Sequence, residues 1–318
     1  MKKQEKLNKK ISIVIPVYNE HKNIPLVHAE LTRVFAGLSY EKEIIFVNDG
    51  STDSSRGVAE ALVEADPQVF LIDFSRNFGK ESATSAGLHY ATGDAVLMLD
   101  ADLQHPPSLI PQFISAWEEG AEVVIGVRKN NASDSYFKKI GSALYYKIVE
   151  LISETEILPR ATDFRLLDRM VVDEFNALTE HSRMTRGLID WLGFKRVPIY
   201  FNAPERVHGE AAYGFWKLVK LATESLIAHS LLPLRFAGYI GITIMLLSGI
   251  LGIVMFLDRY IVSLGLNFSG TAILADITLF LVGIVLVTLG ILAYYIAHIH
   301  KETQNRPLYV VRTKKQIK

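Results

Sequence analysis

Two aspartates directly follow a short apolar segment of the chain. Residues 95–100 are nearly all apolar and predict a buried strand, with Asp100 and Asp102 at its carboxyl end and Gln104 just beyond. Residues two apart on an extended segment project to the same side, and Mg²⁺ or Mn²⁺ is commonly shared between one or two carboxylates and a substrate's phosphates. The spacing therefore suggests a metal bridging a diphosphate. A solvated turn that caps a helix before Pro106 explains the same residues.

Alternating strand and helix patterns surround these aspartates and predict an α/β fold with a mostly parallel, doubly wound sheet. Asp49 follows the second expected strand, so it should lie on the same sheet edge as Asp100 and Asp102, where nucleotides bind in such folds. The sequence contains neither G-x-G-x-x-G after the first strand nor a P-loop, so another arrangement must hold the nucleotide. The expected strands are 11–17, 43–47, 69–74, 95–100 and 122–127, and the expected helices are 24–35, 54–64 and 81–90.

Apolar residues make up 49% of the 318 positions, which is high for a soluble protein and indicates a membrane-attached part. Residues 236–257 and 277–297 contain no charged side chain, and each run is long enough to span a hydrocarbon core of about 30 Å. A buried core helix would need only about 10–14 apolar residues and a polar stripe, which neither run shows. We therefore predict two transmembrane helices.

The flanking charges predict how these helices are oriented. The tail from residue 301 is rich in Lys and Arg, whereas the loop 258–276 has only Arg259 as a cation, so the positive-inside bias places both ends of the hairpin in the cytoplasm. The basic start of the chain is not expected to be a signal peptide, because the apolar run 11–15 after it is short and meets Pro16. We therefore expect a multi-pass protein of the inner (plasma) membrane with a cytoplasmic catalytic domain.

Four parts are expected along the chain. Residues 214–233 carry aromatic and basic side chains suited to the headgroup layer, although packing against the catalytic domain explains them equally well. The chain has no cysteine, so disulfides are excluded, and no nucleic-acid partner is expected. The parts are a catalytic domain (1–213), an amphipathic helix (214–233), a transmembrane hairpin (234–300) and a basic tail (301–318).

Several sequence blocks, in order, resemble glycosyltransferase family 2, in the branch that glycosylates polyprenyl phosphates. The resemblance is to bactoprenol glucosyltransferases and, more distantly, to dolichol-phosphate mannose synthases. It covers essentially the whole chain and implies a GT-A-type nucleotide-binding fold. The blocks are SIVIPVYNE (12–20), VNDGSTD (47–53), SRNFGKE (75–81) and DADLQHPP (100–107), followed by shorter matches at 162–166, 186–187, 191–194, 233–235 and 306–309.

The resemblance implies roles for individual side chains in binding the donor. Tyr18 could instead be a packed aromatic residue, and Gln104 a solvated residue at a helix start. In the implied assignment, Pro16, Tyr18 and Glu20 hold the base and ribose, Asp49 holds the uracil or ribose edge, Asp100 contacts the nucleotide and the metal, and Asp102 and Gln104 complete a Mg²⁺ or Mn²⁺ site.

Asp163 would lie near the acceptor. A phosphate monoester is largely a dianion at neutral pH, since its second pKa is near 6, so Asp163 could orient the acceptor rather than deprotonate it; a salt bridge with Arg165 is the alternative. Relatives commonly have Ser-Lys where this chain has Ala211-Ala212, which leaves the contribution of that loop open. The expected cations for the acceptor phosphate are Arg128, Lys139, Arg165, Arg186 and Arg206.

These observations predict an inverting, metal-dependent enzyme that transfers a sugar from a nucleotide donor, most simply glucose from UDP-glucose, to a polyprenyl (undecaprenyl) phosphate at the cytoplasmic membrane face. The sequence does not fix the sugar, the lipid length or whether several chains form a homo-oligomer. One alternative is a processive polysaccharide synthase, although its Q-x-x-R-W motif does not occur here. Another is a non-catalytic membrane scaffold, against which the intact Asp49, Asp100 and Asp102 argue.

Overall fold

The computed structural model describes residues 9–129, 158, 160–181, 183–202, 257, 261 and 270–316, with only part of the side chains in 270–303. The chain forms two compact units, one of Met1–Ala212 with Arg306–Lys318 and one of Tyr213–Asn305. Several expectations fall outside the described residues: Lys139, Arg206, the amphipathic helix at 214–233, the Ala211-Ala212 loop and nearly all of the first expected span at 236–257.

An eight-stranded sheet with the order β7-β5-β6-β4-β1-β2-β3-β8 forms the framework of the first unit. The pairs β1–β2, β1–β4, β2–β3 and β5–β7 are parallel, while β6 runs antiparallel to β4 and β5, and β8 antiparallel to β3. The prediction of a mostly parallel α/β sheet is therefore confirmed. The strands are β1 (Lys10–Val17), β2 (Glu41–Asn48), β3 (Val69–Phe74), β4 (Ala95–Met98), β5 (Val123–Arg128), β6 (Ala161–Asp168), β7 (Arg196–Phe201) and β8 (Val311–Lys315).

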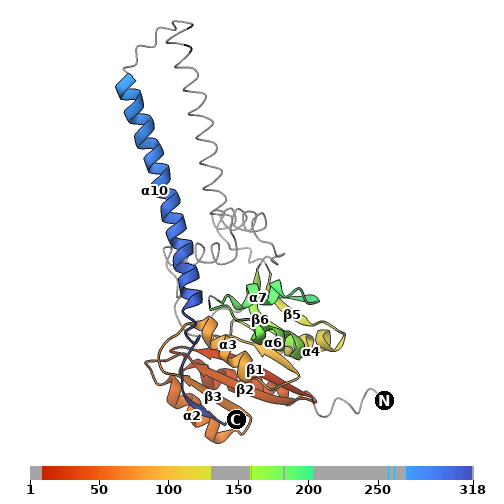
Figure 1. The fold of residues 1–318 in the computed structure, drawn as a ribbon. Helices are drawn as coiled ribbons and strands as arrows, with labels where there is room; N and C mark the ends of the chain where they lie inside the picture. The colour runs from red at the N-terminus through yellow and green to blue at the C-terminus, as the bar shows by residue number, and fades with distance from the viewer. Residues whose placement is uncertain are drawn as a thin grey trace. The chain divides into compact units, whose positions relative to one another are not determined.

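Helices cover both faces of this sheet (Figure 1). Helices α1 (Asn23–Phe35), α2 (Ser55–Ala65) and α4 (Ile110–Glu118) pack on one face, with the short η2 (Pro107–Leu109) before α4. Helices α3 (Lys80–Tyr90), α6 (Arg169–Ala177) and α7 (Thr185–Trp191) pack on the other. Strands that are covered on both faces are expected to be almost continuously apolar, as β1 is. The two helix layers therefore explain why the sequence predicted the central strands.

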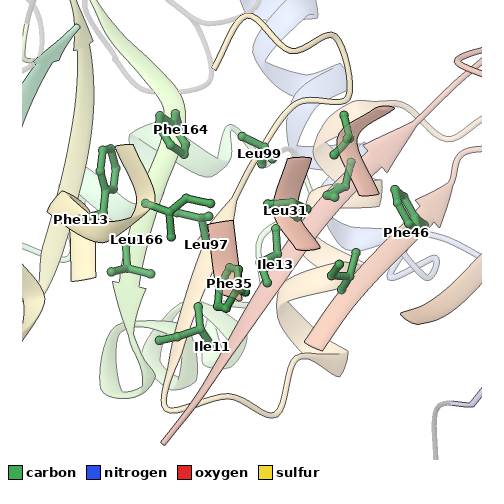
Figure 2. Close-up of a cluster of buried hydrophobic side chains, with 14 of the residues drawn as sticks. Ile11, Ile13, Leu31, Phe35, Phe46, Leu97, Leu99, Phe113, Phe164 and Leu166 are labelled. Carbon is green, nitrogen blue, oxygen red and sulfur yellow. The ribbon is translucent and has the colours of Figure 1, made fainter. Parts of the chain in front are cut away.

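The first of the two apolar cores lies between the sheet and the α1–α2–α4 layer (Figure 2). Ile11 and Ile13 of β1 and Leu97 of β4 meet Leu31 and Phe35 of α1 there, and all five are at most 6% exposed. Farther along, Phe113 lies 4.4 Å from Phe164 between ring centroids, which ties α4 to β6. This packing fixes the carboxyl end of β4 and the amino end of the antiparallel β6, which carry the predicted site residues.

Three strands were not expected from the sequence. Strand β6 carries Asp163, which was expected beside the sheet but lies within it, between β4 and β5. The strand expected at 95–100 ends at Met98, so Asp100 and Asp102 occupy the turn after it. Strands β7 and β8 were not expected either. Strand β8 belongs to the segment predicted to be a basic tail.

The C-terminal segment forms part of the first unit rather than a separate tail. Strand β8 adds an antiparallel edge to β3, and Tyr309 just before it stacks on Phe74 with ring centroids 5.0 Å apart. Arg312 donates a 2.8 Å hydrogen bond to the carbonyl oxygen of Ser75. At least some cations of the tail therefore make structural contacts, in addition to the topological role that their charge predicts.

Helix α10 (Gly270–Thr303) lies in the second unit and includes the second expected span, 277–297. In the described part of the chain, no helix combines the length and the apolar character that crossing a membrane requires.

Candidate active site

Asp100 and Asp163 face the same pocket at the carboxyl end of β4. The antiparallel register pairs Met98 with Arg165, and continuing it by two residues places Asp163 opposite Asp100. The two carboxylates are therefore brought together by strand pairing, although they are far apart in sequence. The pocket is lined by Pro16, Lys80, Glu81, Thr84, Met98, Leu99, Asp100, Asp163 and Thr185.

Lys80, the first residue of α3, joins these two carboxylates. Its Nζ lies 2.6 Å from Oδ1 of Asp100 and 2.8 Å from Oδ2 of Asp163. Burial acts to lower the pKa of Lys80, but the two carboxylates outweigh it and hold that pKa above its usual range. Burial acts to raise the pKa of Asp163, yet the charge and hydrogen bond of Lys80, helped by Arg186 and Arg165, lower it to about 2. Lys80 and Asp163 are therefore both charged throughout the physiological pH range.

Lys80 was not among the residues singled out for the site, although it lies in the quoted SRNFGKE block. The missing information was the partner: nothing in the sequence shows that Asp163, 83 positions away, lies within hydrogen-bond distance. The neighbouring Glu81 fixes the start of α3, because its Oε2 accepts a 2.8 Å hydrogen bond from the backbone N–H of Thr185. A lysine that begins a helix, followed by an aspartate at the end of the next strand, as Lys80 is by Asp100, would be the signal to seek.

Asp49 holds the loop that leads into α3. Its Oδ1 accepts a 2.7 Å hydrogen bond from the backbone N–H of Phe78, and its Oδ2 a 3.0 Å bond from that of Gly79. Burial raises the pKa of Asp49, and these two N–H groups partly oppose the increase. Gly50 has a φ of +64°, and a Cβ there would lie 2.5 Å from the backbone nitrogen of Asn77, so the two loops meet where only glycine fits. The role of Asp49 at the uracil or ribose edge of the nucleotide stays a prediction.

Asp102 and Gln104 form a turn beyond Asp100. The backbone N–H of Gln104 donates a 3.0 Å hydrogen bond to Oδ1 of Asp102, and Oε1 of Gln104 accepts a 3.0 Å bond from Arg128. The structure thus brings together three predicted metal-site residues and one predicted phosphate-binding cation. Arg128, expected to bind the acceptor phosphate, donates to the side-chain oxygen of Gln104, which was expected to bind the metal.

The donor set suits a hard divalent cation. Asp100 and Asp102 supply carboxylate oxygens from one turn, and Mg²⁺ or Mn²⁺ usually takes its remaining ligands from water and substrate phosphates. Within the described residues, no group of three or more His, Cys, Asp and Glu side chains is arranged to hold a metal by protein ligands alone. The site therefore fits a metal that a bound diphosphate helps to hold.

His105 lies behind the turn and was not expected in the site. It is 1% exposed, and its ring stacks on Phe164 at a centroid distance of 5.3 Å. Its Nδ1 accepts a 3.5 Å hydrogen bond from the backbone N–H of Asp100. Burial is the largest cause of a lowered pKa at His105, which the nearby Asp100 charge opposes. A neutral histidine therefore supports the turn that carries the two aspartates.

The expected phosphate-binding arginines lie in different surroundings. Arg165 is fully buried and donates hydrogen bonds of 2.8 and 3.2 Å to the two carboxylate oxygens of Asp190, so it does not pair with Asp163 as the alternative had supposed. Arg186 lies close enough for its charge to lower the pKa of Asp163. Arg165 contributes to the framework of the site through Asp190, so Arg186 is the better of the two candidates for binding an anionic ligand.

The residues expected to hold the base and ribose lie around the end of β1. Pro16 lines the pocket, and Tyr18 is 46% exposed, so it is not the packed aromatic residue of the alternative. Glu20 donates its backbone N–H to Oγ of Ser55 at 2.8 Å and accepts a bond from Asn23, which fixes the turn before α1. Their contacts with a nucleotide stay predictions.

Comparison with known proteins identifies this architecture. Residues 12–175 match the model of "Glycosyl transferase family 2", and the chain belongs to this family. It is a glycosyltransferase by that membership and by near-full-length similarity to other members.

Two relatives and one solved structure illustrate the similarity. A bactoprenol glucosyl transferase of Shigella phage SfX is 38% identical over 96% of this chain and 100% of the relative. An uncharacterized glycosyltransferase of Synechocystis is 38% identical over 95% of this chain and 94% of the relative. The structure of mannosyl-3-phosphoglycerate synthase from Rubrobacter xylanophilus aligns with a TM-score of 0.51 at 17% identity, covering 73% of this chain and 75% of that one, and shows the same fold.

Proposed function

We propose that this glycosyltransferase moves glucose from UDP-glucose to a polyprenyl phosphate, bactoprenol phosphate, with inversion at the anomeric carbon. The observation that carries the proposal is the similarity to bactoprenol glucosyl transferases over nearly the whole of both chains, 38% for the Shigella phage SfX protein and 37% for the Escherichia coli prophage homologue. The geometry supports it, because Asp100 and Asp163 line one pocket at the carboxyl edge of a mostly parallel sheet, where such folds bind nucleotides, and Asp102 lies in the turn just after Asp100.

The reaction needs little proton transfer. An oxygen of the lipid phosphate forms a bond to the anomeric carbon from the face opposite the diphosphate, and the bond from that carbon to the UDP oxygen breaks with its electron pair leaving on UDP. The phosphate monoester is mostly a dianion at neutral pH, since its second pKa is near 6, so no base is required. The low pKa of Asp163, about 2, suits it to orient cations around the acceptor instead.

Asp100 and Asp102 would hold the divalent cation, with Gln104 beside them. When bound, such a cation neutralises the charge that develops on a departing nucleoside diphosphate. The rest of the assignment uses the chain's own residues: His105 and Arg128 support the turn, Pro16 lines the pocket, and Tyr18 and Glu20, just after it in the chain, would hold the base and ribose.

The proposal places the catalytic unit at the cytoplasmic face of the inner membrane. Residues 213–305 lie between two segments of the first compact unit, because 306–318 fold with 1–212. Any crossing of a membrane within 213–305 must therefore be matched by a return crossing. The two expected spans and the lipid nature of the acceptor satisfy that requirement.

Transfer of labelled sugar tests the function directly. Membranes carrying the full chain are incubated with polyprenyl phosphate, Mg²⁺ or Mn²⁺ and a panel of labelled UDP-sugars, and the lipid extract is analysed. We expect one glucose per lipid, and loss of the product in Asp102→Asn. Long saccharide products would favour a processive synthase, while no lipid-linked sugar with any donor, together with function of Asp102→Asn in cells, would favour a scaffold.

A further inference from the structure

Lys80 occupies the position between the two carboxylates of the pocket. Because its Nζ is 2.6 Å from Asp100 and 2.8 Å from Asp163, the two carboxylate oxygens that it contacts lie no farther apart than the sum of these distances. Two carboxylates at this separation repel each other, and a cation between them offsets that repulsion. Lys80 supplies that cation, and one of its two partners, Asp100, is also a predicted ligand of the divalent metal.

Asp100 cannot serve Lys80 and a metal equally well. A divalent cation on the same carboxylate would stand close to an ammonium group, and the repulsion between them would weaken both interactions. Asp163 offers Lys80 another place, since it lies on β6 and not in the Asp100–Asp102 turn. The Lys80 side chain is 43% exposed, so part of it is not packed against neighbouring residues.

We propose that Lys80 is the resident cation of the Asp100–Asp163 pair, that a divalent cation displaces it from Asp100, and that the ammonium then stays on Asp163 and binds the phosphate of the acceptor. The last step rests on the proposed function, and the first two do not. Binding of the metal would thus make Lys80 available to an anionic ligand only after the donor site holds its divalent cation.

The backbone around Lys80 is suited to a movement of the side chain alone. Asp49 fixes the residues before it through the N–H groups of Phe78 and Gly79. Glu81 fixes the residue after it through the N–H of Thr185. With the helix start held on both sides, the ammonium can exchange Asp100 for an anion in the pocket without moving α3.

Direct binding of Mn²⁺ tests the competition without donor or acceptor. The full chain in detergent is titrated with Mn²⁺, and free Mn²⁺ is measured by electron paramagnetic resonance. We expect Lys80→Met to lower the Kd by about tenfold, because removing one positive charge a few ångströms from the ion relieves a repulsion of that order. Lys80→Arg keeps the charge and should bind Mn²⁺ like the unmodified chain, and Asp102→Asn should lose the binding.

Lys42→Met is the matched control. Lys42 is also a lysine in an ion pair, 3.4 Å from Asp66 and 9% exposed, but it lies on β2 away from the pocket residues. Its replacement should leave the Kd for Mn²⁺ unchanged. An equal or higher Kd in Lys80→Met, or Mn²⁺ binding that persists in Asp102→Asn, would overturn the competition.

Two further measurements complete the test. If Lys80→Met does not fold, a structure of the unmodified chain with Mn²⁺ decides: Lys80 should have left Asp100 and kept Asp163, and a retained 2.6 Å contact beside a bound ion would refute the displacement. For the acceptor step, Lys80→Met should raise the KM for polyprenyl phosphate about tenfold at saturating metal, and an unchanged KM would refute it. A chain that is inactive on every lipid but shows the Mn²⁺ effect would refute only the proposed function.

Discussion

Arg165 and Asp190 form a buried ion pair that joins β6 to α7. The arginine is 0% exposed, the side chain of Asp190 is 5% exposed, and the guanidinium donates hydrogen bonds of 2.8 and 3.2 Å to the two carboxylate oxygens. It also donates to the carbonyl oxygens of Thr162 and Arg186. The pair therefore holds the strand that carries Asp163 against the helix that carries Thr185, and both of these residues line the pocket.

Removing one partner of this pair should destabilise the protein. Asp190→Ala leaves a buried guanidinium without its anion, which costs about 3–5 kcal/mol and should lower the Tm by roughly 6–20 °C. Asp173→Asn is the control, because its pair with Arg169 is at the surface, with Asp173 63% exposed, and such pairs contribute about 0–1 kcal/mol. If Asp190→Ala melts normally and only the KM for the lipid rises, Arg165 belongs to the acceptor site after all.

Asp163 should make a pH-dependent contribution to stability. Its pKa falls from an ordinary 3.8 to about 2 in the folded chain, so the unfolded chain binds more protons between these values. The stabilisation is fully present above about pH 4 and is lost as the pH falls toward 2. Thermal melts from pH 2 to 6 should therefore show Asp163→Asn below the unmodified chain at pH 5–6, with the difference shrinking below pH 4. A difference that stays constant over the whole range would contradict this assignment.

The sequence predicted the central strands and the two aspartates because these features have local signals. Strands β1 to β3 are apolar on both faces, and the expected strand at 69–74 has the observed bounds. Asp100 and Asp102 end an apolar run, which places them at a sheet edge in any parallel α/β fold. The helices that separate these strands were recognisable for the same reason, since an apolar face repeats along each of them.

The partners within the site could not be predicted in this way. Arg165 looks like an anion-binding residue from its charge, and only the packing of α7 against β6 shows that Asp190 already neutralises it. The same applies to Lys80 and Asp163, which are brought together by an antiparallel strand inserted between β4 and β5. Strand β8 was not predicted, because its alternating sequence VRTKK is basic and a basic segment after an expected membrane span also predicts a topology signal.

Replacing Asp49 should separate its structural role from donor binding. Asp49→Ala removes the acceptor of two backbone N–H groups, and leaving buried donors unpaired costs about 1–3 kcal/mol each. We expect a lower Tm together with a lower kcat, because the loop that carries Lys80 loses its anchor. A raised Kd for UDP with an unchanged Tm would instead support the predicted contact with the base or ribose.

Tyr309 should anchor the C-terminal strand to the sheet. Its ring stacks on Phe74 with an interplanar angle of 10°, and β8 follows two residues later along the edge of β3. Tyr309→Ala should cost about 1–3 kcal/mol, since a half-buried aromatic contact is lost, and should speed hydrogen exchange of the β8 amides. Tyr200→Ala is the control, because that ring is 56% exposed and its loss should change stability by about 0.5 kcal/mol or less. Fast exchange of the β8 amides in the unmodified chain would show that the edge strand is not a stable part of the sheet, and would remove the requirement that residues 213–305 return to the side from which they leave.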